Sequence, residues 1–241
     1  MSTSKIALVT GASRGVGAGV AQQLAQRGVD IAINYRNKGG RAETVAAAVR
    51  AAGRAVLTVQ ADLTLPNDRA AMMDAIRERF GRLDLLVLNA SGGLEKGKPA
   101  DYPRLLNVTA QVELVNAALP LMGKGSRIVF VTSHLAHFHD RHPVTGPYEP
   151  VAASKHAGEQ ALRARVGELR ARGIGFVVVS GDMIEGTITP RLLERMAAGT
   201  LDARRRQAGG LPTIEDFACA ISDAALREPF SDATVFVGAT E

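Results

Sequence analysis

Three glycines near the start of the chain have the spacing of a phosphate-binding loop. Gly11, Gly15 and Gly17 follow the apolar run of residues 6–10 and precede a segment with helical periodicity. In such a unit the first glycine permits a tight turn, the second lets the backbone approach a pyrophosphate, and the third lets the helix pack close to the strand. Because the helix N-terminus attracts negative charge, the segment predicts a dinucleotide site. A glycine pattern taken alone could also be an ordinary strand–helix turn.

Two arginines lie where the adenosine ribose of a dinucleotide is expected. An acidic side chain at the end of the second strand would accept hydrogen bonds from a free 2′-hydroxyl. This chain instead has Tyr35, Arg36 and Asn37 there, and Arg14 lies in the glycine loop. Guanidinium groups suit a 2′-phosphate, so the pattern predicts NADPH/NADP+ as the cofactor. The alternative is that both arginines are only exposed surface side chains.

The rest of the chain has the pattern of a sheet that could position these groups. Short apolar runs alternate with longer amphipathic segments from residue 6 to residue 237, which is typical of a parallel sheet covered on both faces. The 241 residues, 46% of them hydrophobic, are enough for a large core. No linker rich in proline, glycine or serine divides them. We expect a single-domain α/β Rossmann fold over residues 1–241, with a doubly wound parallel sheet of about seven strands.

The expected elements follow from the same alternation. Strands are expected at residues 6–10, 30–35, 55–60, 83–91, 127–132, 175–180 and 234–237. Helices are expected from the glycine loop to about residue 28, at residues 40–52 and 67–80, through residues 106–110, and at residues 150–172 and 211–226.

With these elements the chain resembles the classical short-chain dehydrogenase/reductase family over nearly its whole length. The family's phosphate loop Thr-Gly-x-x-x-Gly-x-Gly corresponds to residues 10–17. Its adenine-binding Asp and aliphatic residue correspond to Asp62 and Leu63, and its Asn-Asn-Ala-Gly motif to residues 88–91, where both outer positions differ. The resemblance implies an NADP(H)-dependent oxidoreductase that forms a homodimer or homotetramer.

The resemblance also implies roles around the nicotinamide. Ser133 would hydrogen-bond the substrate carbonyl, Asn107 would hold a water of the proton relay, and Lys155 would hold the nicotinamide ribose. A mid-helix asparagine such as Asn107 could instead be a packed polar residue. The implied cofactor contacts are Gly11, Ser13, Arg14, Gly15, Val16, Gly17, Tyr35, Arg36, Asn37, Asp62, Leu63, Asn89, Ala90, Ser91, Lys155, Ile184 and Thr187.

The family's Tyr-x-x-x-Lys motif lacks its tyrosine in this chain. Val151 stands four residues before Lys155, whereas Tyr148 lies seven residues before it. In the family the tyrosine is the general acid for ketone reduction, and valine has no proton to donate. The mechanism of the family therefore does not transfer intact.

Four of the five histidines lie in the loop between residues 133 and 151, which is longer than we expect for the family, whereas segment 91–107 looks shorter. These histidines are His134, His137, His139 and His142. As metal ligands they match no familiar zinc spacing, and we expect no metal site. One of them, or Tyr148, could replace the missing acid, since imidazole titrates near neutrality. Alternatively they are polar loop residues, and water or a substrate hydroxyl delivers the proton.

Composition argues against partners other than small molecules. The net charge is +5, but basic and acidic residues are interspersed, so nucleic-acid binding is not expected. The basic run 204–206 is expected to be a solvated helix end or loop, or to meet an acidic substrate group. No apolar run approaches the roughly 20 residues of a membrane span, residues 1–5 are too short and polar for a signal sequence, and the single Cys219 allows no intrachain disulfide. We expect a soluble, cytoplasmic protein.

Two functions remain. The favoured one is an NADPH-dependent reductase of a ketone or related carbonyl on a small, apolar or polycyclic molecule, with tyrosine-independent proton transfer. Residues 185–210 would form its substrate lid. The alternative, motivated by Val151, is a catalytically silent NADP(H)-binding sensor or partner protein.

Overall fold

The computed structural model describes residues 4–142, 144 and 146–240. A seven-stranded sheet in the order β3-β2-β1-β4-β5-β6-β7 forms its centre, and every pair of neighbouring strands is parallel. The strands are β1 (Ile6–Val9), β2 (Asp30–Tyr35), β3 (Val56–Gln60), β4 (Leu85–Leu88), β5 (Arg127–Ser133), β6 (Gly175–Gly181) and β7 (Val235–Val237). The predicted doubly wound Rossmann fold is confirmed.

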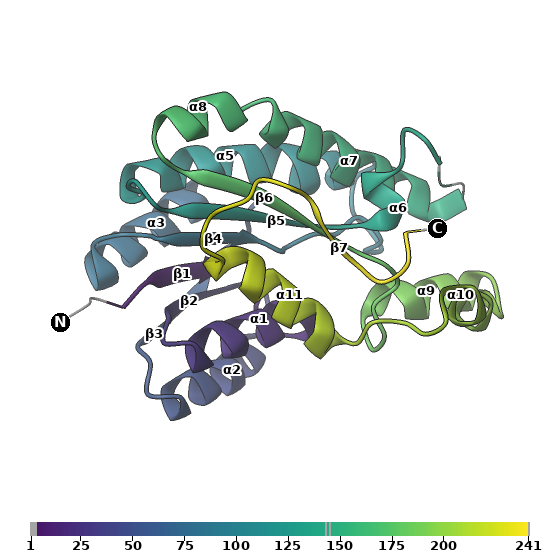
Figure 1. Cartoon of the computed structure of the whole chain (residues 1–241), viewed down its shortest axis with the longest axis horizontal. Helices are drawn as coiled ribbons and strands as arrows, with labels where there is room; N and C mark the ends of the chain where they lie inside the picture. Colours follow the sequence, from purple (N-terminus) through teal and green to yellow (C-terminus); the bar gives the residue numbers. More distant parts are fainter. Residues whose placement is uncertain (1–3, 143, 145, 241) are drawn as a thin grey trace.

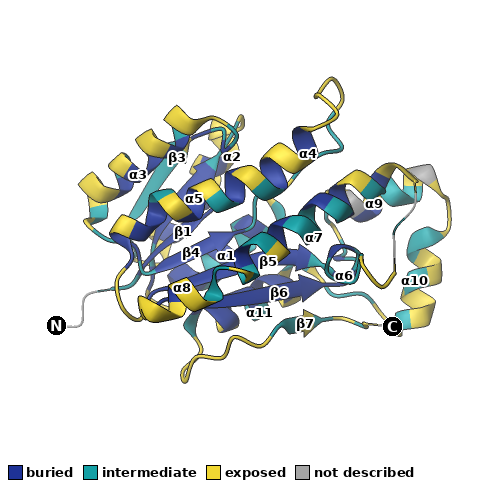
Figure 2. Ribbon diagram, turned by 90° about the horizontal axis from the view of Figure 1, so that it is seen from above, coloured by how far each residue is buried: buried dark blue, intermediate teal, exposed yellow. Residues whose placement is uncertain are grey.

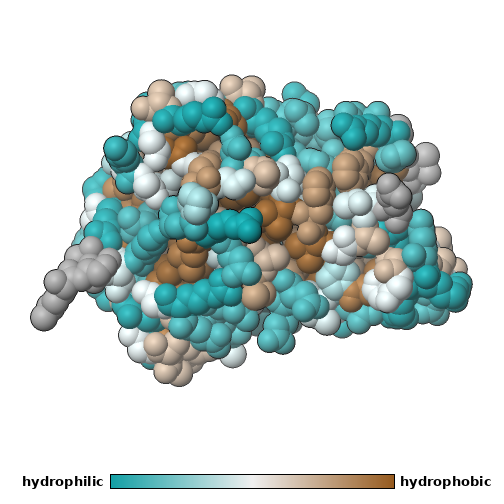
Figure 3. All heavy atoms as spheres, viewed as in Figure 1, coloured by the Kyte–Doolittle hydropathy of each residue, from teal (hydrophilic) through white to brown (hydrophobic). Residues whose placement is uncertain are grey.

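Helices cover both faces of the sheet, as Figure 1 shows. One face carries α1 (Gly15–Gln26), α2 (Gly39–Ala51) and α11 (Ile214–Leu226), and the other carries α3 (Pro66–Phe80), α5 (Ala110–Ala118), α7 (Glu149–Arg163) and α8 (Val166–Ala171). Figure 2 shows buried strands between helices whose outer faces are exposed. Figure 3 shows hydrophobic atoms between the hydrophilic ones near the middle of one face.

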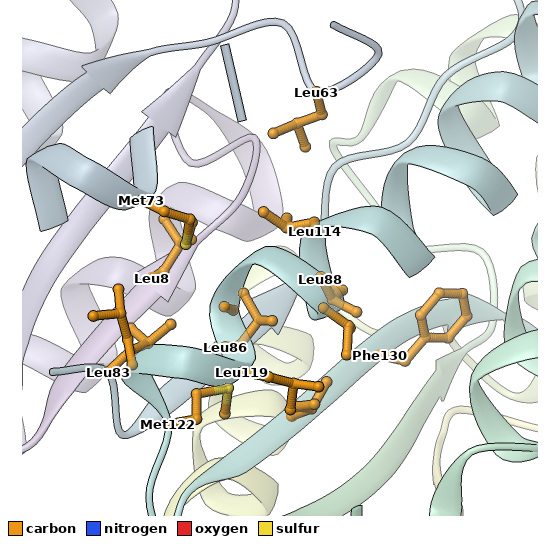
Figure 4. Close-up of a cluster of buried hydrophobic side chains, with 14 of the residues drawn as sticks. Leu8, Leu63, Met73, Leu83, Leu86, Leu88, Leu114, Leu119, Met122 and Phe130 are labelled. Carbon is orange, nitrogen blue, oxygen red and sulfur yellow. The ribbon is translucent and has the colours of Figure 1, made fainter. Parts of the chain in front are cut away.

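Two apolar cores follow from the alternation of side chains along the strands. Leu8 and Leu86 point to one face, where they join a cluster with α3 and α5 that is drawn in Figure 4. Their neighbours Val9 and Val87 point to the other face and pack against α1 and α11. Both faces of the central strands are therefore apolar, which explains their continuous hydrophobic runs.

Two predicted helices differ from the structure. The helix expected over residues 150–172 is two helices, α7 and α8, because the chain turns at residues 164–165. The helix through Asn107 is composite: α4 (Tyr102–Arg104) leads into a π-helical turn at Leu105–Thr109 and then into α5. Such turns are frequent at functional sites.

Shorter elements complete the chain. The long loop after β5 contains α6 (His134–His137) and a 3-10 turn at Gly146–Tyr148, and the stretch after β6 contains α9 (Ile188–Met196) and α10 (Thr200–Ala208). Among the described residues, no helix is both long and apolar enough to cross a membrane.

Candidate functional site

The site begins at the strand-order switch between β1 and β4, where ligands bind in open parallel sheets. The Thr10 hydroxyl accepts hydrogen bonds from the backbone N–H groups of Asn89 and Ala90, each at 2.9 Å. The Asn89 amide donates to the Thr10 carbonyl at 2.9 Å. Asn89 therefore joins the ends of β1 and β4.

The glycine loop has the backbone that its spacing predicts. Gly11 and Gly15 have φ of 63° and 57°, a left-handed region that favours glycine. A Cβ atom at Gly17 would lie 2.6 Å from the Asn89 amide nitrogen and 2.8 Å from the Gly11 carbonyl. Only glycine fits there without movement of the neighbouring strand end.

This loop fits a pyrophosphate. Arg14 is the N-cap of α1, and no side chain caps the helix, so its first backbone N–H groups are available to an anion. A Cβ at Gly15 would meet no atom within 4 Å, which leaves the approach to these groups open.

Asn34 supports the glycine loop from β2, a contact that was not predicted from the sequence. Its side chain is buried; its oxygen accepts from the Gly11 N–H at 3.2 Å and its nitrogen donates to the Ala61 carbonyl at 3.1 Å. Asn34 therefore ties the glycine loop to the end of β3. The sequence did contain a signal for this role, since Asn34 is a single amide side chain in an otherwise apolar strand.

Asp62 presents an ionised carboxylate beside this end of the site. Burial opposes its ionisation, but hydrogen bonds from the Thr64 hydroxyl and N–H and the positive charges of Arg36 and Lys98 outweigh it, so the pKa of Asp62 is lowered. The Thr64 hydroxyl donates to it at 2.7 Å. An adenine amino group is a donor that such a carboxylate can accept.

Arg36 lies at the end of β2, as predicted, but it is already paired. Its guanidinium donates to the Tyr102 hydroxyl and lies 3.5 Å from a Glu95 carboxylate oxygen. Neither partner was identified from the sequence. Arg14 is exposed at the N-cap of α1.

Asn107 connects the segment after β4 to α7. Its amide nitrogen donates to the Gly92 carbonyl and to the Ser154 hydroxyl, each at 2.9 Å, and its oxygen accepts from the Gly92 N–H at 3.3 Å. The packed polar interpretation therefore describes this side chain. A role in ordering water stays a prediction.

Lys155 faces a narrow crevice that is also lined by Ala90, Ser91, Asn107 and Gln111. Burial lowers the pKa of Lys155 to about 8, and the negative charge of Glu159 acts in the opposite direction. The amine is therefore mainly charged at neutral pH and loses its proton more readily than an exposed lysine.

Glu159 lies one turn beyond Lys155 and is fully buried. It accepts from the Arg163 guanidinium at 2.8 Å, and the Nδ1 atom of His137 lies 2.8 Å from the same carboxylate oxygen. Glu159 was not predicted from the sequence, although its i+4 spacing from Lys155 places both on one helix face. This carboxylate links the histidine segment to the helix that carries Lys155.

Ser133 ends β5, and its hydroxyl is buried without a hydrogen-bond partner among the described residues. An unsatisfied buried hydroxyl is costly. A ligand carbonyl at this position would remove that cost.

Val151 and Tyr148 both lie in an apolar cluster beside the site. Each is 4% exposed, and they pack with Ala136 and Ala152 from α6 and α7. Leu94, Leu135, Val144 and Leu193 pack against this cluster. A residue at position 151 is thus enclosed by apolar side chains, including one from α9.

His134 and His137 pack against the same rings, Phe138 and Phe236, but their polar partners differ. The His134 Nδ1 atom lies 2.8 Å from the Ser180 hydroxyl, and burial lowers the pKa of His134. His137 contacts Glu159, and His139 Nε2 lies 3.7 Å from a Glu149 oxygen. Within the described part of the chain, no three His, Cys, Asp or Glu side chains could hold a metal ion together.

The basic run 204–206 is not simply solvated. Arg204 lies 2.9 Å from an Asp182 carboxylate oxygen and donates to the Ala239 carbonyl at 2.6 Å. Arg205 lies 2.7 Å from Glu185. These ion pairs connect α10 to the loop after β6. Folding brings the opposite charges together, so Arg204 and Arg205 are paired within the protein.

Comparisons with known proteins agree with this arrangement. The family model for short chain dehydrogenase matches residues 5–196. The hydroxynaphthalene reductase of Aspergillus fumigatus is 39% identical over 140 residues, which cover 54% of this chain and 50% of that protein. The match therefore spans about half the length of this curated relative.

Two solved structures resemble nearly the whole chain. A short chain dehydrogenase from Burkholderia cenocepacia in complex with NADP has a TM-score of 0.83 at 32% identity, covering 97% of this chain and 96% of that chain. The angucycline C-6 ketoreductase LanV with bound NADP has a TM-score of 0.80 at 27% identity, covering 98% and 95%.

Proposed function

The chain belongs to the short chain dehydrogenase family, and we propose that it is an NADPH-dependent reductase of a ketone or related carbonyl on a small apolar molecule. NADPH, when bound, supplies the hydride. The glycine loop and the N-terminus of α1 bind the pyrophosphate, and Asp62 accepts from the adenine. Arg14 and Arg36 bind the 2′-phosphate. NADP in both structural neighbours supports this choice of cofactor.

The observation that carries the reductase proposal is the buried, unpaired hydroxyl of Ser133 at the carboxyl end of β5. A substrate carbonyl that accepts from this hydroxyl is held at the edge of the sheet where the cofactor site lies. Lys155 donates to the nicotinamide ribose, and Asn107 orders a water behind it. The two side chains line one crevice.

The residue at position 151 does not deliver the proton, because the Val151 side chain has no ionisable group. Tyr148, a loop histidine, water or a substrate hydroxyl supplies the proton instead. His137 reaches the Lys155 helix through Glu159, and Tyr148 is packed beside Val151.

The substrate class in this proposal is apolar and polycyclic. Hydroxynaphthalene reductase and an angucycline ketoreductase are among the similar proteins. The cluster around Val151, with Leu94, Leu135 and Leu193 against it, offers an apolar wall. Residues 185–210, with α9 and α10, form the substrate lid, and the enzyme acts in the cytoplasm as a homodimer or homotetramer.

The alternative function is an NADP(H)-binding sensor or partner protein without catalytic activity. Val151 in place of the family's acid favours it. The two functions share the cofactor site and differ in turnover, so an activity measurement separates them.

Replacing Arg36 with aspartate should reverse the cofactor preference. The parent should bind NADPH at least about tenfold more tightly than NADH, since charge-assisted hydrogen bonds to a 2′-phosphate need contribute only about 1.4 kcal/mol. In Arg36→Asp the carboxylate repels the phosphate and accepts from the ribose hydroxyl. Fluorescence titration with both cofactors measures the ratio. Arg41→Asp, on the exposed side of α2, is the control, and equal cofactor affinities in the parent would refute the assignment.

Replacing Tyr148 with phenylalanine tests the proton donor. If Tyr148 is the acid, turnover should fall by about 10²-fold or more, while NADPH affinity stays unchanged because the ring is retained. Steady-state kinetics and cofactor titration report the two effects separately. Unchanged turnover would exclude Tyr148, and pH profiles of alanine variants would then test the loop histidines His134, His137, His139 and His142.

A further inference from the structure

The carboxylate of Glu95 lies on Arg36, the side chain to which the cofactor's 2′-phosphate is assigned. The Arg36 guanidinium and a Glu95 oxygen are 3.5 Å apart, and the two side chains are 32% and 34% exposed. The other Glu95 oxygen accepts from the Gly93 N–H at 2.6 Å. Glu95 therefore has a second, backbone partner that does not depend on Arg36.

A second cation, Lys98, lies beside this pair, across the Tyr102 ring. The Arg36 guanidinium lies 6.0 Å from the centre of the Tyr102 ring, and the Lys98 ammonium lies 4.6 Å from the same centre. Both cations also lower the pKa of Asp62. With Glu95 moved away, Arg36 and Lys98 would present two positive charges around one aromatic ring.

We propose that Glu95 takes the place of the 2′-phosphate on Arg36, and that NADP(H) binds by displacing it. Glu95 is thereby a specificity-determining residue, and the segment after β4 is part of the cofactor site. This inference rests on the NADP(H) function proposed above.

The exchange is physically favourable. A partly exposed ion pair at 3.5 Å stabilises the protein little, whereas a phosphate can accept two charge-assisted hydrogen bonds from one guanidinium. The hydrogen bond from Gly93 remains available to Glu95 after the exchange. NAD(H) has no 2′-phosphate, so it leaves the Arg36–Glu95 pair in place. The carboxylate therefore opposes NADP(H) binding and not NAD(H) binding.

The test is calorimetric titration of the full chain with NADP+ and with NAD+. Glu95→Gln keeps the shape and removes the charge, so it should tighten NADP+ binding by about three- to tenfold, on the order of 1 kcal/mol, and change NAD+ binding less than about twofold. Asp101→Asn is the matched control, because it makes the same charge change in the same exposed segment without contacting Arg36. It should leave both affinities unchanged.

Three results would overturn the inference. Unchanged or weaker NADP+ binding in Glu95→Gln would overturn the inference and leave the assignment of NADP(H) as the cofactor intact. Equal tightening in Asp101→Asn would show a general charge effect. Failure of the parent to bind NADP+ would remove both the inference and the function on which it rests.

Discussion

Replacing Lys155 with methionine should lower kcat/KM for carbonyl reduction by on the order of 10²- to 10³-fold and weaken NADPH binding by about tenfold. Methionine keeps the apolar stem of the side chain but removes the group that holds the ribose, and misplaced reactants are costly in rate. Stopped-flow fluorescence measures cofactor binding, and NADPH oxidation measures turnover. Lys124→Met, at an exposed position, should match the parent. Turnover of Lys155→Met within about threefold of the parent would remove Lys155 from the site.

The same residue gives cofactor binding a pH dependence. Burial lowers the pKa of Lys155 to about 8 in the free protein, and an anionic cofactor raises it by favouring the charged form. The contribution of Lys155 to NADPH affinity should thus be constant below pH 8 and fall as the pH rises above it. The Lys155→Met variant should lack this fall.

The fold could be predicted from the sequence because buried parallel strands are continuous apolar runs. Leu8 and Val9 point to opposite faces of the sheet, and both faces are covered by helices, so both side chains are apolar. The glycine loop was equally readable, since Gly17 stands where any side chain would meet Asn89.

Contacts between distant segments could not be read in this way. The residues adjacent to Glu95 in the sequence do not indicate that it contacts Arg36, because that contact depends on the path of the segment after β4. The histidines looked like one group in the sequence. The short helix α6 instead directs His134 toward β6 and His137 toward α7.

Replacing Val151 with tyrosine should reduce activity on the true substrate by at least about tenfold, although it restores the family's acid. Val151 is 4% exposed and packed among apolar side chains, so a tyrosine ring must extend into the space assigned to substrate. Overpacking should also cost about 1–3 kcal/mol of stability, which thermal unfolding measures. NADPH affinity should change less than about twofold. Val151→Phe is the control, since it adds the ring without the hydroxyl.

NADPH oxidation by the parent and by Val151→Tyr, measured on one panel of polycyclic and simple ketones, distinguishes a reductase from a silent NADP(H) binder. The reductase proposal predicts that the parent oxidises NADPH with at least one polycyclic ketone and that Val151→Tyr does so more slowly. A parent that is inactive on the whole panel, together with a Val151→Tyr variant that reduces simple ketones, would contradict it and identify the protein as a silent NADP(H) binder.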